Sequence, residues 1–451
     1  MSGGSDVANW SGAPAGLGAS TNAWLTRLIM FVALLVFASL LANYRVDLPY
    51  GWDARVNCAA VAAHLEGLDP YFVKNLKDTN FFYPYLPVTL DAFRPVCAGG
   101  ILLAHQTVIF IGLAILSALL LPALGKSRGD ARNVALKLLC AFGAFAGFEW
   151  VVTAGNFAIL SGLLTALALA LLLGGDPRTL APRVAGAAVL GLVTSFKLVF
   201  FPVLAGLYFL PLPRGQKLTV LAAGAAGFVA PFLISMVFYA DIFPSWLNAV
   251  TGHIPGQHSL AIDEKNPSLF LFATDVADQL GLSGHKLVAV AIYGLLVVAL
   301  VLAPLALSVR RAVRASGAAS LRRLDRWLMD HPGHAARIAA LAMFALYLCS
   351  PRLKEYAFFE LAIYAAVLIA DLPALALAAV LISAIAIPAL ASLLTNAFVQ
   401  NFGQLATGLV CFWICLADLR SRLSEAGWAD SGKVVRAAGV EPAQRLRTEG
   451  F

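Results

Sequence analysis

Charged residues are scarce in this chain of 451 residues: they form 13% of the sequence, while hydrophobic residues form 60%. Soluble domains carry roughly twice that charged fraction, and no polar segment here is long enough to fold as a soluble domain. The net charge of +7 does not indicate a nucleic-acid partner, because a basic excess in a membrane protein usually reflects its cytoplasmic loops. We therefore predict an integral membrane protein that does not bind nucleic acid.

Metal-binding patterns are also lacking. The six cysteines show no metal-ligand spacing, and His253 and His258 have no nearby carboxylate or third histidine to complete a site. The sequence therefore predicts no metal site and no cofactor. Cys58 and Cys97 flank the first large polar loop and can pair if that loop faces an oxidising space, but the sequence leaves their pairing open.

Long apolar runs are what the chain has in abundance. A helix needs about 20 apolar residues to cross the hydrocarbon. Eight such runs are clear, at residues 24–42, 98–124, 134–152, 157–173, 218–239, 287–308, 372–393 and 402–417. Two longer stretches, 184–210 and 338–370, are interrupted by SFKLVFFP and SPRLKEY.

Basic loops give the direction of these runs. Lys and Arg gather at residues 125–132, 178–183, 213–217 and 309–326, which we predict to be cytoplasmic. Each interrupted stretch then starts and ends on the same side, so it must be a hairpin of two helices. The result is an all-α polytopic membrane protein with about 12 transmembrane helices. We expect it in a bacterial inner (cytoplasmic) membrane, among membrane lipids, with both termini cytoplasmic.

The predicted organisation is one membrane domain with two tails. Residues 1–22 are predicted to be a disordered cytoplasmic tail, residues 23–418 the transmembrane domain, and residues 419–451 a cytoplasmic basic tail. Two large loops, 43–96 and 240–285, face the periplasm or the outside. The sequence does not determine the oligomeric state.

The first outer loop opens on GWDARVNCAAVAAHLEGLDPY, residues 51–71. The spacing of its apolar residues predicts a helix from Asp53 to Glu66 that lies along the outer interface and stops at Gly67. Asp53 is a good N-cap residue, because its carboxylate accepts bonds from the free N–H groups of the first turn. It is also a candidate catalytic carboxylate, and the two roles are compatible.

Three cations lie at the breaks of the interrupted stretches, where a charge is costly and is usually kept for a function. Lys197 lies between two apolar half-helices, and it either snorkels to the interface or faces an anionic headgroup. Arg352 and Lys354 lie together at the second break, beside Tyr356. Arg offers a forked set of donors and Lys a point charge, so this pair is a candidate phosphate cradle.

Six short motifs occur in a fixed order along the chain. They are Asp53 with GLDPY (67–71), FFYPYLP (81–87), GNFAILSG (155–162), SFKLVFFP (195–202), NPSL (266–269) and SPRLKEY (350–356). In this order they resemble glycosyltransferase family 87, the polyprenol-phosphate-mannose-dependent mannosyltransferase-like proteins of the GT-C superfamily. The resemblance covers most of the chain.

The resemblance implies a GT-C-like bundle that acts as a membrane glycosyltransferase. Such an enzyme moves a hexose, by default mannose, from a polyprenyl-phosphate sugar donor to a hydroxyl group of a lipid or glycan acceptor, with inversion. Asp53 is then the general base, and Arg352, Lys354 and Lys197 hold the donor phosphate. Lower-ranked sugar or acceptor contacts are Asn57, Tyr71, Tyr83, Asn156, His253, His258, Asn266 and Tyr356.

Two other classes of protein remain open at this point. A transporter or flippase of lipid-linked sugars also builds its site from broken helices with charges at the breaks. However, the breaks fall nearer the outer face than the midplane, and a transporter has little use for an interfacial helix led by a carboxylate. A structural subunit of a cell-envelope complex needs no charged breaks at all.

Overall fold

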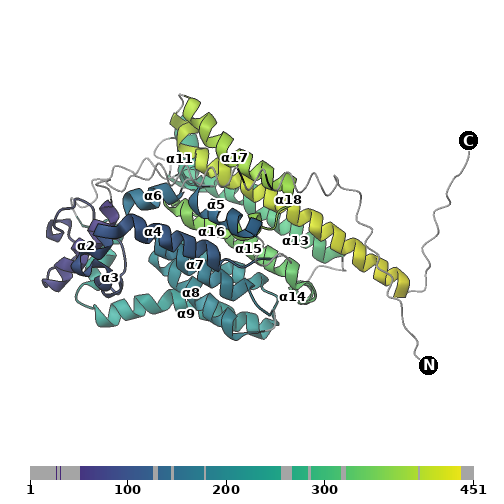
Figure 1. Cartoon of the computed structure of the whole chain (residues 1–451), viewed down its shortest axis with the longest axis horizontal. Helices are drawn as coiled ribbons and strands as arrows, with labels where there is room; N and C mark the ends of the chain where they lie inside the picture. Colours follow the sequence, from purple (N-terminus) through teal and green to yellow (C-terminus); the bar gives the residue numbers. More distant parts are fainter. Residues whose placement is uncertain are drawn as a thin grey trace, which may run out of the picture.

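The computed structural model describes residues 27, 31, 51–124, 131–143, 147–176, 179–254, 267–282, 286–315, 321–394 and 397–437. Within these ranges every regular element is a helix and no strand occurs (Figure 1), which confirms the all-α class. The predicted tail at 1–22 lies outside the described residues, as does the first predicted span apart from residues 27 and 31.

Five helices in the described ranges are long and apolar enough to cross a membrane. They are the kinked helix formed by α3 (Thr89–Cys97), η2 (Ala98–Gly100) and α4 (Ile101–Leu120); α9 (Arg214–Phe238); the helix formed by α12 (Lys286–Val297), η4 (Val298–Leu302) and α13 (Ala303–Ala315); α17 (Ala374–Leu393); and α18 (Ala397–Ala437). Helix α18 thus continues beyond the predicted boundary at residue 418.

A bent pair of helices is a sixth candidate span. Helices α5 (Ala131–Phe142) and α6 (Gly147–Ala154) occupy the predicted run 134–152, but their axes differ by 53°, so the run is a broken helix rather than a straight one. Shorter apolar helices complete the bundle: α7 (Ala158–Leu173), α8 (Ala181–Phe196), η3 (Leu198–Phe209), α15 (Pro332–Leu348) and α16 (Ala357–Ile369). The total of about 12 membrane helices remains a prediction.

Both predicted hairpins form. Arg337 near the start of α15 pairs with Asp371 just after α16, and at the other end the Tyr347 hydroxyl donates to the carbonyl of Ala357, so α15 and α16 run antiparallel. Helix α8 ends at Lys197, whose backbone is extended, and the 3-10 helix η3 runs back beside α8. The charged breaks of the sequence are therefore the turns of these hairpins.

The remaining elements lie at the two ends of the bundle. At one end, α2 (Trp52–Leu65), α3 and α10 (Phe243–Val250) share a second buried cluster that includes Tyr71, Tyr83 and Trp246, and the short 3-10 helix η1 (Val73–Asn75) follows α2 in the chain. Helix α11 (Leu269–Gln279) follows α10 in the chain, and α14 (Leu321–Asp330) lies at the opposite end from α2 (Figure 1).

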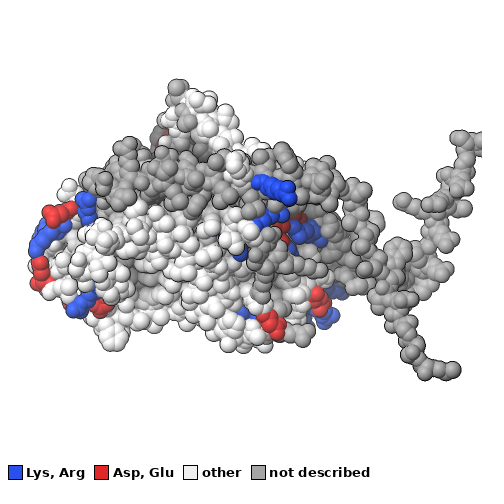
Figure 2. Space-filling view, in the orientation of Figure 1, with Lys and Arg blue, Asp and Glu red and all other residues white. Residues whose placement is uncertain are grey.

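Charged side chains gather at these two ends, and the surface between them is almost free of charge on the face that Figure 2 shows. An uncharged belt between two charged ends is what a bilayer requires, because charged groups are costly in hydrocarbon. The long apolar helices and this belt together identify a membrane protein.

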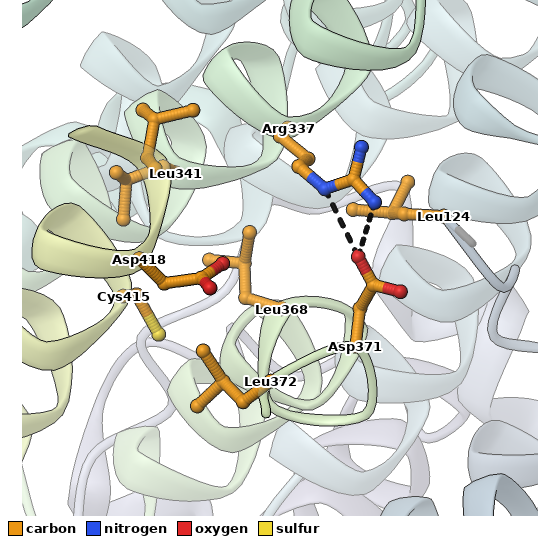
Figure 3. Close-up of a pocket in the computed structure, with 9 residues that line it drawn as sticks. Leu124, Arg337, Leu341, Leu368, Asp371, Leu372, Cys415 and Asp418 are labelled. Carbon is orange, nitrogen blue, oxygen red and sulfur yellow. Dashed lines mark hydrogen bonds and ion pairs between the residues drawn. The ribbon is translucent and has the colours of Figure 1, made fainter. Parts of the chain in front are cut away.

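Salt bridges fasten the helices at the α14 end. Figure 3 shows Arg337 and Asp371 pointing toward each other beside a cavity of about 10 Å³, which holds no more than a water molecule. Arg422 of α18 donates to the carbonyl of Asp371 at 2.9 Å and to Asp418 at 2.7 Å. This cavity is too small for a substrate, so we interpret the cluster as structural.

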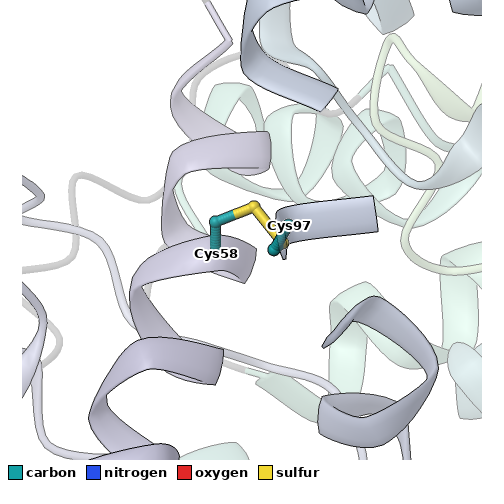
Figure 4. The surroundings of a disulfide bond; sticks show 2 residues. All are labelled: Cys58 and Cys97. Carbon is teal, nitrogen blue, oxygen red and sulfur yellow. A yellow bond between two sulfur atoms is a disulfide. The ribbon is translucent and has the colours of Figure 1, made fainter. Parts of the chain in front are cut away.

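A disulfide joins Cys58 of α2 to Cys97 at the end of α3, with the Cα atoms 5.3 Å apart (Figure 4). The structure thus supplies the pairing that the sequence left open. Because the bond links α2 directly to the first long helix, it holds the α2 end of the bundle in place.

Candidate active site

Helix α2 begins one residue earlier than predicted, and this changes the role of Asp53. Gly51 occupies the N-cap position with φ 88°, and no side chain caps the helix, so the predicted N-cap role of Asp53 is wrong. Asp53 is instead the second residue of the helix, where the helix dipole still favours a negative charge. Its carboxylate is therefore available for a contact outside α2.

That contact is Asn156, in the turn between α6 and α7. The Asn156 Nδ2 atom donates to Oδ2 of Asp53 at 2.5 Å, and its Oδ1 atom accepts from the backbone N–H of Ala158 at 2.9 Å. Asn156 is buried, while Asp53 is partly exposed. The amide is thus held by α7 and in turn fixes one oxygen of the carboxylate.

A close backbone junction brings these two side chains together. Gly51 donates its N–H to the carbonyl of Thr153 at 2.8 Å. Gly155 has φ 68°, and a Cβ atom there would lie 2.8 Å from both the Ala54 Cβ atom and the Gln106 Oε1 atom. Only glycine fits this approach without strain.

Gln106 was missed by the sequence reasoning. It is a polar residue inside the apolar helix α4, and its Nε2 atom donates to the carbonyl of Val152 at 2.6 Å, which ties α4 to the junction. The available signal was a lone amide in an apolar span, next to His105. His105 is exposed.

Lys197 brings a positive charge to the same place. Its Nζ atom is buried and has no hydrogen-bond partner among the described residues, and it lies 4.3 Å from the centre of the Tyr356 ring. A buried ammonium over an aromatic face gains a cation–π interaction, but its hydrogen-bonding capacity stays unused. Such a group is suited to an anionic ligand.

The loop that carries Arg352 and Lys354 is held from both sides. Ser268, which caps α11, donates to the carbonyl of Pro351 at 2.9 Å, and the Tyr293 hydroxyl donates to the carbonyl of Cys349 at 2.5 Å. The NPSL and SPRLKEY motifs, far apart in sequence, therefore meet. Arg352 is exposed and Lys354 partly buried.

The charged side chains of the site interact electrostatically. Burial raises the pKa of the Asp53 carboxyl above its ordinary value, while the hydrogen bond from Asn156 and the charges of Lys197 and Lys354 oppose the increase. The charge of Arg352 acts on Tyr356 in the same group. The site is thus one carboxylate with a raised pKa and two interacting cations, Lys197 and Lys354, with Arg352 near them, an arrangement in which a base and an anion site adjoin.

A second carboxylate, fully buried and also missed from the sequence, interacts with Lys197. Glu360 of α16 accepts hydrogen bonds from Ser161 at 2.9 Å, Thr165 at 3.0 Å and Tyr347 at 3.3 Å. Its charge also acts on Lys197. An acidic residue in the first turn of an apolar helix was the available signal, and we interpret Glu360 as a countercharge for the lysine.

Comparison with known protein families identifies the family of this chain. Residues 81–351, more than half of the chain, match glycosyltransferase family 87. The chain belongs to glycosyltransferase family 87. It is therefore an enzyme, a membrane glycosyltransferase that uses a sugar donor and an acceptor, and the expected GT-C superfamily fits. No curated protein and no solved structure matches the chain significantly.

The matched range contains two parts of the site of this family 87 enzyme and stops short of the others. Asn156 and Lys197 lie within residues 81–351, whereas Asp53 precedes that range and Lys354 follows it. The assignment of Asp53 and Lys354 to the site therefore depends on the contacts and charges described above.

Tyr71 and Tyr83 lie in the loop 43–96 of the family 87 enzyme and are fully buried. The Tyr71 hydroxyl donates to the carbonyl of Tyr85 at 2.8 Å, and the Tyr83 hydroxyl shares a 2.5 Å hydrogen bond with Thr89. Both side chains therefore hold the loop together. Asn57 is also buried, one turn beyond Asp53 on the same side of α2.

Of the histidine and asparagine candidates in the loop 240–285, His253 alone lies within the described residues. His253 is exposed after α10 and shares a 2.6 Å hydrogen bond with Thr251. In the described ranges, no hydrogen bond or charge interaction joins His253 to Asp53. His258 and Asn266 lie outside the described residues.

Proposed function

We propose that this enzyme transfers a hexose, by default mannose, from a polyprenyl-phosphate sugar to a hydroxyl group of a lipid or glycan acceptor, with inversion at the anomeric carbon. The observation that carries the proposal is the pairing of one hydrogen-bonded carboxylate, Asp53, with two cations, Lys197 and Lys354, while a third cation, Arg352, acts on Lys197 and Tyr356 beside them. This set matches a reaction that needs one base and one anion site.

A single carboxylate suffices because the leaving group is a phosphate. Glycoside hydrolases need a carboxyl pair, since one member must protonate the departing oxygen. A lipid phosphate leaves as an anion and needs no general acid. Asp53 takes the proton from the acceptor hydroxyl as that oxygen attacks the anomeric carbon from the face opposite the phosphate. The bond to Asn156 leaves the second carboxylate oxygen for this proton.

The cations stabilise the charge that develops on the departing phosphate. Fixed charges of this kind commonly contribute a factor of about 10²–10³ in rate per group. The buried Nζ atom of Lys197, which has no hydrogen-bond partner in the described part of the chain, supports its role as a phosphate ligand. The Tyr356 ring and the negative charge of Glu360 stabilise the ammonium.

The proposed reaction takes place at the outer face of a bacterial inner membrane, with both termini cytoplasmic. The disulfide at α2 supports this side, because disulfides persist in oxidising compartments. A cysteine in place of exposed Leu68 is expected to react with an impermeant label on intact cells. A cysteine in place of exposed Arg322 in α14 is expected to react only after lysis. The reverse labelling pattern contradicts the orientation.

The donor class is tested with the purified enzyme in liposomes that contain membrane-lipid acceptors. We expect sugar transfer from labelled polyprenyl-phosphate mannose and none from GDP-mannose. Direct use of the nucleotide sugar contradicts the proposal. Translocation of the labelled lipid without any transfer product favours the flippase alternative.

Donor binding is tested separately with Arg352→Ala and Lys354→Ala. Hydrogen bonds to charged groups contribute about 1.5–3 kcal/mol, so each variant is expected to bind the donor about 10–100-fold more weakly. Lys77→Ala is the matched control, since Lys77 pairs with Glu66 on the exposed surface at 2.6 Å. Normal donor affinity in both test variants means that the donor phosphate does not bind to Arg352 and Lys354.

A further inference from the structure

An open cavity of about 690 Å³ lies against the start of α2. Trp52 and Arg55 of α2 form one wall, Lys74 of η1 another, and Asp78 and Phe81 of the following segment a third. Cavities of about 300–1,000 Å³ are typical of small-molecule sites. Figure 2 shows side chains of both charges gathered at the end of the molecule that carries α2.

The cavity and the catalytic carboxylate occupy adjoining sides of a single helical turn. Trp52 and Arg55 are three residues apart, so they lie on the same side of α2. Asp53 follows Trp52 and is rotated from it by about 100°, toward Asn156 and the cations. Asp53, Lys197 and Lys354 do not line the cavity, so a molecule bound there reaches Asp53 from the neighbouring side of α2.

The cavity wall combines three kinds of group. Trp52 and Phe81 offer aromatic faces against which the apolar face of a sugar ring can pack. Arg55 and Lys74 offer charged donors, which bind carboxylate or phosphate oxygens. Asp78 is placed to accept hydrogen bonds from sugar hydroxyl groups. With two cations and one anion among these residues, the wall favours a ligand that is both a carbohydrate and an acid.

We propose that this cavity is the acceptor site and that it selects a carbohydrate bearing a phosphate or carboxylate group. The inference rests on the proposed function, because an acceptor is needed only if the enzyme transfers the sugar of a separate donor. The acidic group lies between Arg55 and Lys74, the sugar ring lies on Trp52, and a hydroxyl group of that ring or the next reaches Asp53.

Binding is measured without turnover, by saturation-transfer NMR on the full chain in phosphatidylcholine nanodiscs. The probes are glucose 6-phosphate, glucuronic acid and glucose. We expect both acidic sugars to bind at least about tenfold more tightly than glucose, a difference of about 1.4 kcal/mol. Equal binding of the three sugars overturns the proposal.

Variants locate the binding site. Arg55→Gln and Lys74→Gln are each expected to weaken binding of the acidic sugars about tenfold while leaving glucose binding unchanged. Lys77→Gln, next to the cavity but paired with Glu66, is expected to change neither. Acidic-sugar binding that is unaffected in both cavity variants overturns the proposal. A thermal melt of each variant excludes misfolding as the cause.

The acidic group of the acceptor can belong to a lipid headgroup or to a free glycan. A competition experiment distinguishes these two sources. If phosphatidylinositol in the nanodisc displaces glucose 6-phosphate, the acceptor is a lipid; if it does not, the acceptor is a free glycan. Asp53→Asn is expected to bind the acidic sugars like the wild type. Failure of the acceptor proposal therefore appears in binding, whereas failure of the proposed function appears in transfer.

Discussion

Gly155→Ala is the substitution that best tests how the site is assembled. Gly155 has a left-handed backbone (φ 68°), where a Cβ atom costs about 1–2 kcal/mol. The new Cβ atom would also lie 2.8 Å from the Ala54 Cβ atom and 3.0 Å from the Gly51 Cα atom. Carbon atoms in ordinary contact are about 3.5–4.0 Å apart, so α2 must retreat by roughly 0.7 Å or more.

This displacement acts directly on the bond between Asn156 and Asp53, which spans the same junction. A misplacement of about 1 Å can cost a factor of about 10² in rate, so we expect transfer to fall about 10–100-fold. The assay is the initial rate of sugar transfer in liposomes with donor and acceptor at saturation. The thermal midpoint of each sample is measured in parallel.

Gly175→Ala is the matched control. Gly175 has almost the same backbone (φ 73°), but nothing lies within 4 Å of its Cβ position. It should therefore lose about the same 1–2 kcal/mol of stability and keep its transfer rate. The reasoning is refuted if Gly155→Ala retains wild-type activity, or if both variants lose activity equally.

Three further predictions concern charge, covalent linkage and capping. Lys354→Gln removes a charge that lowers the pKa of Asp53. The pKa of Asp53 should therefore rise, and the acidic limb of the pH–rate profile should move to higher pH. A limb that does not move contradicts the interaction between Lys354 and Asp53. Replacing both Cys58 and Cys97 with Ser removes a cross-link between residues 39 apart. A thermal melt should then report that the free energy of unfolding is lower by about 4 kcal/mol. An unchanged melt shows that the disulfide does not stabilise the fold. Ser268→Ala removes the α11 cap and the hydrogen bond to the loop that carries Arg352 and Lys354. The donor KM should therefore rise, and the free energy of unfolding should fall by about 1–2 kcal/mol. A normal donor KM shows that this hydrogen bond does not contribute to donor binding.

The sequence predicted elements well wherever a local pattern determines them. Apolar length and periodicity predicted the helices, and the helix expected from Asp53 to Glu66 is observed at Trp52–Leu65. The breaks at SFKLVFFP and SPRLKEY are hairpin turns because charges and proline interrupt the apolar runs there. The order of the motifs led to the correct family.

Contacts between distant segments were not predictable in the same way. Asp53 looked like an N-cap because Asp is common there, yet Gly51 takes that position so that its N–H group can reach the carbonyl of Thr153. Gln106 and Glu360 act only through residues far away in sequence. Tyr71 resembled a ligand contact because it lies in a motif, whereas its hydroxyl bonds inside the loop.

The central claim is that Asp53 is the base for a sugar transfer in which the lipid phosphate leaves without an acid. The most direct measurement is the single-turnover rate of Asp53→Asn with polyprenyl-phosphate mannose bound to the enzyme before acceptor is added. Asn keeps the size of the side chain and removes the base, so we predict a rate about 10²–10⁴-fold lower at unchanged donor affinity. Transfer by Asp53→Asn at the wild-type rate contradicts the account.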